Sequence, residues 1–138
     1  MVTIAFVCVG NAGRSQLAAG LAERERDLRA FDVDIVTGGV SPANQVYDEV
    51  RTVLLEIDVD IGDRVPRQIE RDDLVDAEYV ITMGCSVDEL LPDGFDGEIR
   101  SWSIESDGDG LPGYRQQREE LAEQVGALFD EIAERNRD

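Results

Sequence analysis

Short apolar runs alternate along the chain with segments of helical periodicity. Residues 2–7 form a β-branched apolar run of the kind that lies buried on both faces of a sheet. Between Ser15 and about Ala30, apolar residues recur at helical spacing beside a charged face, which predicts an amphipathic helix. The same reading predicts three further strands and three further helices. The strands are expected at 33–36, 79–83 and 99–104, and the helices at 46–57, 71–76 and 115–134.

Strands that alternate with helices predict an α/β fold, in which a parallel sheet carries helices on both faces. We expect a single three-layer domain spanning residues 1–138. In such sheets, ligands bind beyond the carboxyl ends of the strands. Cys8, Cys85 and the loop after Trp102 each follow a predicted strand. All three are therefore expected to open onto the same edge of the sheet.

The segment between the first strand and the first helix carries the strongest candidate chemistry. Its backbone amides can turn inward around one anion, and the helix N-terminus adds a partial positive charge. Arg14 can grip two oxygens of a bound group, and the same field favours the thiolate of Cys8. Without any Lys the chain cannot build the nucleotide-binding P-loop. The predicted oxyanion-binding residues are Val9, Gly10, Asn11, Ala12, Gly13, Arg14 and Ser15.

Within this segment, Gly10 and Gly13 leave room for a tight curl of the backbone. Ser15 is placed to donate a hydrogen bond to the Cys8 sulfur, and Asn11 to fix the shape of the loop. A buried, inert cysteine at a strand end is the plain alternative. The combination of strand, cysteine, two glycines, Arg-Ser and helix favours the catalytic interpretation.

The charge of the chain limits the classes of binding partner and the cellular environment that we expect for it. The net charge is −18, with 31 acidic residues against 13 basic ones, all of them Arg, and no His. Such a surface disfavours nucleic acid and anionic membrane as partners, and it is typical of salt-adapted proteins. No apolar stretch has the length of a membrane span. Two cysteines without a secretory segment indicate a reducing, cytoplasmic compartment. We expect no metal and no cofactor.

Residues 7–15 resemble the signature of the low-molecular-weight protein tyrosine phosphatases and the related thioredoxin-coupled arsenate reductases. The similarity covers almost the whole chain, and residues 15–18, 38–43 and 80–85 look more like the reductase branch. The resemblance implies a four-stranded sheet in the order 2-1-3-4, which makes the first and third strands neighbours. It also implies that Cys8 attacks arsenate, that Cys85 resolves the adduct as a disulfide, and that thioredoxin or a low-molecular-weight thiol reduces it.

Several departures from the family pattern leave alternatives open. Gly13 stands where the phosphatases carry a second loop cysteine, and Leu91 where the reductases carry a further cysteine before a proline. Ala19 stands at an acidic position of the reductases' cation site. The family's Asp-Pro general acid is missing from its loop. Asp107 is the first candidate for that acid and Glu105 the second, although such a glycine-rich acidic loop is also typical of a solvated turn.

Two other functions remain possible on this evidence. A phosphatase that hydrolyses phosphotyrosine through a cysteinyl phosphate needs Cys8, Arg14 and an acid, but no Cys85. Its cleft usually has aromatic walls, and aromatic residues make up only 6% of this chain. A non-catalytic module that binds an oxyanion would keep the loop and lack the acid.

Overall fold

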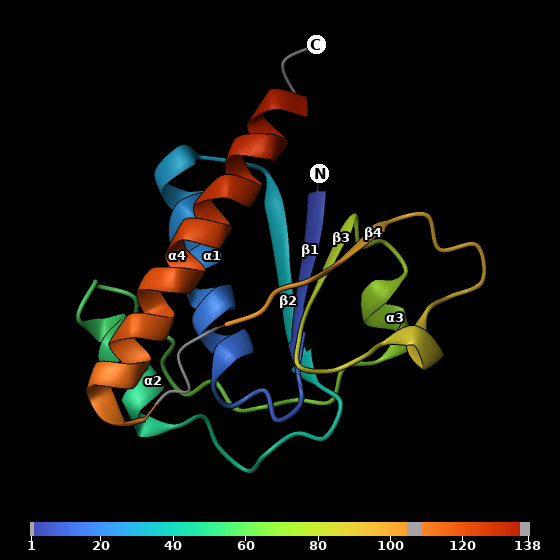
Figure 1. Ribbon diagram of the computed structural model, residues 1–138. Coiled ribbons are helices and arrows are strands. Elements are labelled where there is room, and N and C mark those ends of the chain that lie inside the picture. Colours follow the sequence, from blue (N-terminus) through green and yellow to red (C-terminus); the bar gives the residue numbers. More distant parts are fainter. Residues whose placement is uncertain (1, 105–108, 136–138) are drawn as a thin grey trace.

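The computed structural model describes residues 2–104 and 109–135. Its centre is a parallel sheet of four strands in the order β2-β1-β3-β4, which confirms the expected order (Figure 1). β1 pairs with β2 on one side and with β3 on the other, and β4 is an edge strand paired with β3. The strands are β1 (Val2–Cys8), β2 (Val33–Gly39), β3 (Tyr79–Met83) and β4 (Glu98–Ser101).

Helices cover both faces of this sheet, as the alternating pattern predicts. One face carries α1 (Arg14–Arg29), α2 (Asp48–Leu55) and the long α4 (Gly110–Arg135). The other face carries α3 (Arg71–Leu74) and the short 3₁₀ helix η1 (Asp88–Leu90) (Figure 1). No helix among residues 2–104 and 109–135 has the length and apolarity needed to cross a bilayer.

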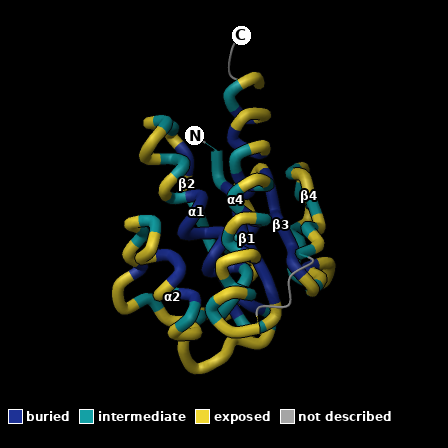
Figure 2. Tube along the Cα trace, turned by 60° about the vertical axis from the view of Figure 1, so that its left-hand side comes forward, coloured by how far each residue is buried: buried dark blue, intermediate teal, exposed yellow. Residues whose placement is uncertain are grey.

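β1 shows how the sheet divides the core in two. Ile4 and Phe6 pack with α1, α2 and α4, whereas Ala5 and Val7 pack on the opposite side with α3 and the segment around Val87. Successive side chains of a strand point to opposite faces, so both layers draw on one short apolar run. Figure 2 shows the buried residues concentrated in β1 and β3 and on the inner sides of α1 and α4, whereas the edge strand β4 is exposed or intermediate. The side chain of Cys8 lies on the same face of the sheet as those of Ile4 and Phe6, the face covered by α1, α2 and α4.

Several boundaries differ from the sequence prediction. β4 ends at Ser101, although the N–H of Trp102 still donates to the carbonyl of Thr82 at 2.9 Å, and the ring of Trp102 packs 5.9 Å from that of Phe6. α4 begins at Gly110, five residues before the predicted start, because Pro112 is tolerated in the first turn of a helix. β2 continues to Gly39, three residues beyond its predicted end. The 3₁₀ helix η1 had no signal in the apolar pattern.

Candidate active site

The loop between β1 and α1 curls at the carboxyl edge of the sheet and is braced by the segment 40–47. An ideal Cβ on Gly39 would lie 2.5 Å from the carbonyl oxygen of Val9, so only glycine lets β2 end so close to the loop. Four backbone amides of the brace then donate to carbonyls of the loop. These bonds run from Val40 to Cys8, from Ser41 to Val9, from Ala43 to Gly10 and from Tyr47 to Ala12, at 2.9–3.1 Å.

Cys8 lies inside this curl with only 4% of its surface exposed. Its Sγ is 2.9 Å from the hydroxyl oxygen of Ser15 and accepts a hydrogen bond from the backbone N–H of Asn11 at 3.2 Å. Donors that point at a sulfur stabilise its anionic form over the thiol. The geometry therefore suits a nucleophilic thiolate.

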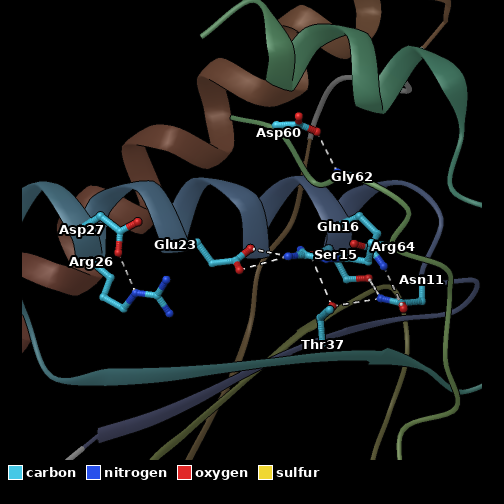
Figure 3. Close-up of polar contacts among 10 residues, drawn as sticks. All are labelled: Asn11, Ser15, Gln16, Glu23, Arg26, Asp27, Thr37, Asp60, Gly62 and Arg64. Atoms are coloured by element: carbon cyan, nitrogen blue, oxygen red, sulfur yellow. Dashed lines mark hydrogen bonds and ion pairs between the residues drawn. The ribbon is translucent and has the colours of Figure 1, made fainter. Parts of the chain in front are cut away.

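Asn11 organises the loop from a fully buried position. Its backbone is left-handed, with φ of 52°, a conformation that Asn adopts more readily than most residues. Its side-chain amide donates to Ser15 Oγ at 2.7 Å and to Thr37 Oγ1 at 2.9 Å (Figure 3). Its Oδ1 accepts from Gln16 Nε2 at 3.0 Å and from the backbone N–H of Arg67 at 3.1 Å. Both donors and both acceptor positions of the amide are thus used.

This network also fixes which way the hydroxyl of Ser15 points. Thr37 Oγ1 donates to the carbonyl of Phe6 at 2.9 Å, so its oxygen is free to accept from Asn11. Ser15 Oγ likewise accepts from Asn11, which leaves the Ser15 proton for a neighbouring acceptor. The Cys8 sulfur, 2.9 Å away, is that acceptor. The serine hydroxyl accordingly donates to the Cys8 sulfur.

Arg14 opens α1 and lies over the end of β3. The position of an ideal Cβ on Gly84 is 2.9 Å from Nη2 of Arg14, so the guanidinium rests against the backbone of Gly84. The first turn of α1 carries no acidic residue, and its N-terminus has no side-chain cap. The free N–H groups there and the guanidinium give this mouth a positive character suited to an oxyanion.

Cys85 follows β3 and reaches the same loop. Its thiol lies 3.6 Å from the carbonyl oxygen of Val7, in the peptide bond that leads into Cys8. Burial is the largest effect on the pKa of Cys85 and raises it; a hydrogen bond with the Met83 backbone lowers it by less, and the still smaller effects of Cys8 and Arg14 raise and lower it respectively. Both cysteines are free thiols, Cys8 buried and Cys85 partly exposed. Cys85 is therefore a protonated thiol that packs with the Val7 side of the sheet, against the peptide bond that leads into Cys8.

The predicted general acids and the cation-site position of the first helix remain to be placed in the structure. Asp107 and Glu105 both lie outside the described residues. Ala19 is 1% exposed, and the carboxylate one turn further along α1, that of Glu23, is 2.9 Å from the guanidinium of Arg64 (Figure 3). Ala19 itself offers no ligand to a cation, and the nearest acid on its helix face already has a partner.

Some residues of the site gave no sequence signal. Thr37 and Gln16 hold Asn11 from β2 and α1, and they read as ordinary strand and helix positions. The ring of Tyr47 lies 3.5 Å from the Cβ position of Gly13 and 6.3 Å from the ring of Tyr114, centroid to centroid. Because residues 47 and 114 are far apart in sequence, no local pattern could pair these rings beside the loop.

A parallel α/β sheet with a buried cysteine in an anion-binding loop defines a class of enzymes that attack oxyanions through a thiolate. A sequence model described as low molecular weight phosphotyrosine protein phosphatase matches residues 3–137. The chain belongs to this family.

Individual relatives point to one branch of that family. A provisionally named arsenate reductase of Halobacterium salinarum is 42% identical over 130 residues, covering 92% of this chain and 90% of that protein. The glutaredoxin arsenate reductase of Synechocystis is 30% identical over 136 residues, covering 96% of this chain and all of that protein. The structure of a thioredoxin-dependent arsenate reductase from Corynebacterium glutamicum superposes with a TM-score of 0.80 at 28% identity, over 96% of this chain. This chain spans 62% of the Corynebacterium protein.

Proposed function

We propose that this protein is a thiol-dependent arsenate reductase in which Cys8 is the nucleophile and Cys85 the resolving thiol. The observation that carries the proposal is the contact between the Cys85 thiol and the carbonyl of Val7, 3.6 Å apart, which brings the second thiol against the peptide bond of the first. β1 and β3 are direct neighbours, and Cys8 is the register partner of Met83, two residues before Cys85. Adjacent strands lie ~4.8 Å apart, and a modest movement of the loop after Met83 would bring the Cα of Cys85 within the ~7 Å of Cys8 that a disulfide needs.

The reaction begins with attack of the Cys8 thiolate on arsenic. A sulfur–arsenic bond forms, and an arsenic–oxygen bond breaks as that oxygen leaves as water. Arg14 and the loop amides bind the remaining oxygens, whose charge they match. The thiolate of Cys85 then attacks Cys8 Sγ. The sulfur–sulfur bond forms, the sulfur–arsenic bond breaks, and its electron pair stays on arsenic, which leaves as arsenite.

The remaining roles are those of the proton donor, the loop amides and the electron donor. The departing oxygen needs protons, and Asp107 is our first choice for the donor, with Glu105 as the alternative. Val9, Gly10, Ala12 and Gly13 supply amides to the oxyanion. A thiol such as thioredoxin or a low-molecular-weight thiol returns the two electrons. Residues 1–138 act as one catalytic unit in a reducing, salt-rich cytoplasm, which suits two free thiols and a net charge of −18.

The second candidate is hydrolysis of phosphotyrosine through a cysteinyl phosphate. The tyrosine pair favours it, since the half-exposed ring of Tyr47 stands beside Gly13 with Tyr114 behind it. Aromatic walls can hold a substrate ring over the loop. This activity would use Cys8 and Arg14 in the same roles and leave Cys85 idle.

Substitution of Cys85 separates the two functions. We expect Cys85→Ser to bind oxyanion and to hydrolyse an aryl phosphate slowly, yet to lose multiple-turnover reduction of arsenate. Cys8→Ser, the matched control, should lose both activities. Wild-type protein given arsenate without a donor should lose two free thiols, and the chain has only two cysteines to supply them. Full arsenate turnover by Cys85→Ser would contradict the proposal. Brisk hydrolysis with no arsenate-dependent loss of thiols would favour the phosphatase.

A further inference from the structure

The segment 64–69 contacts the edge of β2 and carries one of the donors that hold Asn11. The backbone N–H of Arg67 donates to Asn11 Oδ1 at 3.1 Å, beside the hydrogen bond that this oxygen accepts from α1. The same stretch of backbone pairs with Gly39. The Gly39 N–H donates to the carbonyl of Arg67 at 2.9 Å, and the Gly39 carbonyl accepts from Ile69 at 3.0 Å. The position of the Asn11 side chain therefore depends on where this segment lies.

The side chain of Arg67 fixes the same segment from the outside. Its Nη1 donates to the carbonyl of Thr37 in β2 at 3.0 Å, and its Nη2 donates to both carboxylate oxygens of Asp73 in α3 at 3.0 Å. Asp73 is a firm anchor, because it also accepts from the Glu70 N–H at 2.8 Å and precedes Leu74, which is fully buried against the sheet. The guanidinium thus spans β2 and α3 and holds the backbone between them.

Asn11 carries this restraint to the nucleophile. Its amide donates to Ser15 Oγ at 2.7 Å, and the Ser15 hydroxyl donates to Cys8 Sγ at 2.9 Å (Figure 3). The Asn11 backbone N–H donates to the same sulfur at 3.2 Å. Donors to a sulfur favour its anionic form, so their alignment decides how much of Cys8 is thiolate. Arg67 therefore acts on the sulfur through a chain of hydrogen bonds.

The pocket beside this chain is where the family resemblance implies a cation. Ala19, the residue at that position, lines a pocket of about 360 Å³ together with Arg64 and Arg67. Two carboxylates also line this pocket, and an arginine already binds each of them. Glu23 accepts from Arg64 at 2.9 Å, and Asp73 accepts from Arg67 at 3.0 Å. Neither carboxylate is left for a metal cation.

A neutral oxygen is what the side chains of this pocket still offer. Gln16 Oε1 is buried in its wall, and no described residue donates to it. Cations such as Ca²⁺ and Mg²⁺ take about six oxygen ligands, carboxylates among them. The two guanidinium groups in the same pocket also repel a further cation. The residues of this flank therefore do not fit a bound cation.

We propose that Arg67 is a positioning residue for Cys8, and that its guanidinium takes the place that a bound cation would have beside Asn11. The inference rests on Cys8 as the nucleophile of the proposed function. Without the guanidinium, the segment loses its links to Thr37 and Asp73, and the donor to Asn11 Oδ1 is no longer held in place. The contacts act at hydrogen-bond distance and the Asp73 side chain is only 19% exposed, so molar salt screens them less than charges separated by solvent.

The test measures the rate at which iodoacetamide alkylates Cys8 over a range of pH, in molar potassium chloride. The parent is the full-length chain with Cys85→Ser, in which Cys8 is the only thiol. Arg67→Ala should slow alkylation about three- to tenfold near neutral pH and be no slower at high pH, because only the thiolate fraction falls. Arg67→Lys keeps the charge and can keep one contact, so it should restore part of the rate.

Arg64→Ala is the matched control. It removes the same charge from the same pocket and breaks the ion pair with Glu23, while Arg51 can still donate to the carbonyl of residue 64, at 2.6 Å in the native chain. Its pH profile of alkylation should match that of the parent. Asp73→Asn keeps an acceptor for the first turn of α3 but weakens the clamp. It should shift the profile as Arg67→Ala does, add little to it in the double variant, and carry the test if Arg67→Ala does not fold.

Three results would overturn the inference. The first is an unchanged profile in both Arg67→Ala and Asp73→Asn, and the second is an equal shift in Arg64→Ala. The third is alkylation of the parent several-fold faster in potassium chloride than in sodium chloride of the same concentration, which would mean that a bound ion positions the loop. Alkylation uses neither arsenate nor an aryl phosphate. If the variants behave as expected and the wild type reduces no arsenate, only the reductase proposal fails.

Discussion

The guanidinium of Arg14 rests on Gly84 so closely that a Cβ at position 84 would lie 2.9 Å from Nη2. Gly84 also has a positive φ of 77°, which L side chains rarely adopt. One glycine therefore ends β3, turns the chain toward Cys85 and leaves room for Arg14, the cation of the candidate oxyanion site. This relationship couples the backbone of the third strand to the chemistry of the first loop.

We expect Gly84→Ala to weaken phosphate binding and catalysis by about tenfold or more, equivalent to ~1.4 kcal/mol, because the added methyl group displaces Arg14. Gly94→Ala is the matched control. Gly94 has nearly the same φ, 76°, and an added Cβ there meets nothing within 4 Å. Both variants should lose similar stability, and only Gly84→Ala should lose phosphate affinity by calorimetric titration. Equal affinities would show that Arg14 is free to move aside.

Thr37→Val should loosen the loop through Asn11. The valine offers no acceptor, so one buried N–H of the Asn11 amide is left unpaired, at a cost of about 1–3 kcal/mol in stability. Because Asn11 positions Ser15, alkylation of Cys8 by iodoacetamide should also slow, measured in a Cys85→Ser background. Thr37→Ser keeps the hydroxyl and should behave like wild type. Unchanged alkylation in Thr37→Val would argue against the hydrogen-bond chain from Thr37 to Cys8.

The sequence predicted the sheet, its layers and the curled loop, because these follow from local periodicity and turn chemistry. The apolar run of β1 alone predicts a buried strand, without any knowledge of residues far away in the sequence. The support of the loop could not be predicted in the same way. Gln16 and Thr37 meet Asn11 from different elements, and nothing in their own segments marks them as partners.

Edges of elements were the least predictable part of the fold. β4 has a partner on one side only, and its Ile99 is 41% exposed, so its apolar pattern is weak. Gly110 and Pro112 read as loop residues, although they form the first turn of α4. In each case packing against another element decided what the local pattern left open.

Glu56 gives a test of stability against pH. Hydrogen bonds from Arg115 and Arg118 lower the pKa of Glu56 to about 2 from an ordinary value of 4.5, and they join the end of α2 to α4. A carboxyl whose pKa is lowered by folding stabilises the folded state at any pH above its pKa in the unfolded chain. This contribution disappears as the pH falls from that value toward the pKa in the folded state. Glu56→Gln should lower Tm at neutral pH, and its deficit should vanish between about pH 4.5 and pH 2.

The control for that experiment is Glu119→Gln. It removes the same charge from an exposed carboxylate that is 3.8 Å from Arg118. Its Tm should differ little from wild type across the whole range. A deficit in Glu56→Gln that stays constant down to pH 2 would mean that the ion pair does not cause it.

Salt should stabilise this protein. With a net charge of −18, carboxylates repel one another across the surface, and dissolved ions screen that repulsion. Each ~1 kcal/mol gained would raise Tm by roughly 3–5 °C for a chain of this size. Thermal melts in sodium chloride and in potassium chloride, from dilute to molar, provide the measurement. A flat or falling Tm would contradict adaptation to salt.

The raised pKa of Cys85 predicts the pH dependence of disulfide formation. Only a thiolate attacks sulfur, and burial holds Cys85 in its thiol form beyond the ordinary range of a cysteine, ~8.5. The fraction of Cys85 that can resolve the Cys8 adduct therefore rises with pH up to and past that range. In single turnovers with arsenate and no donor, the loss of two thiols should accelerate as the pH is raised from ~6.5 to ~9.5. Hydrolysis of an aryl phosphate, which does not use Cys85, should not share this rise, and it serves as the control in the same buffers.

A rate of thiol loss that is flat over this range would mean that another step limits the reaction, or that a neighbouring base deprotonates Cys85. A rate that falls would place the controlling proton on a group that must stay protonated, such as the acid that donates to the departing oxygen.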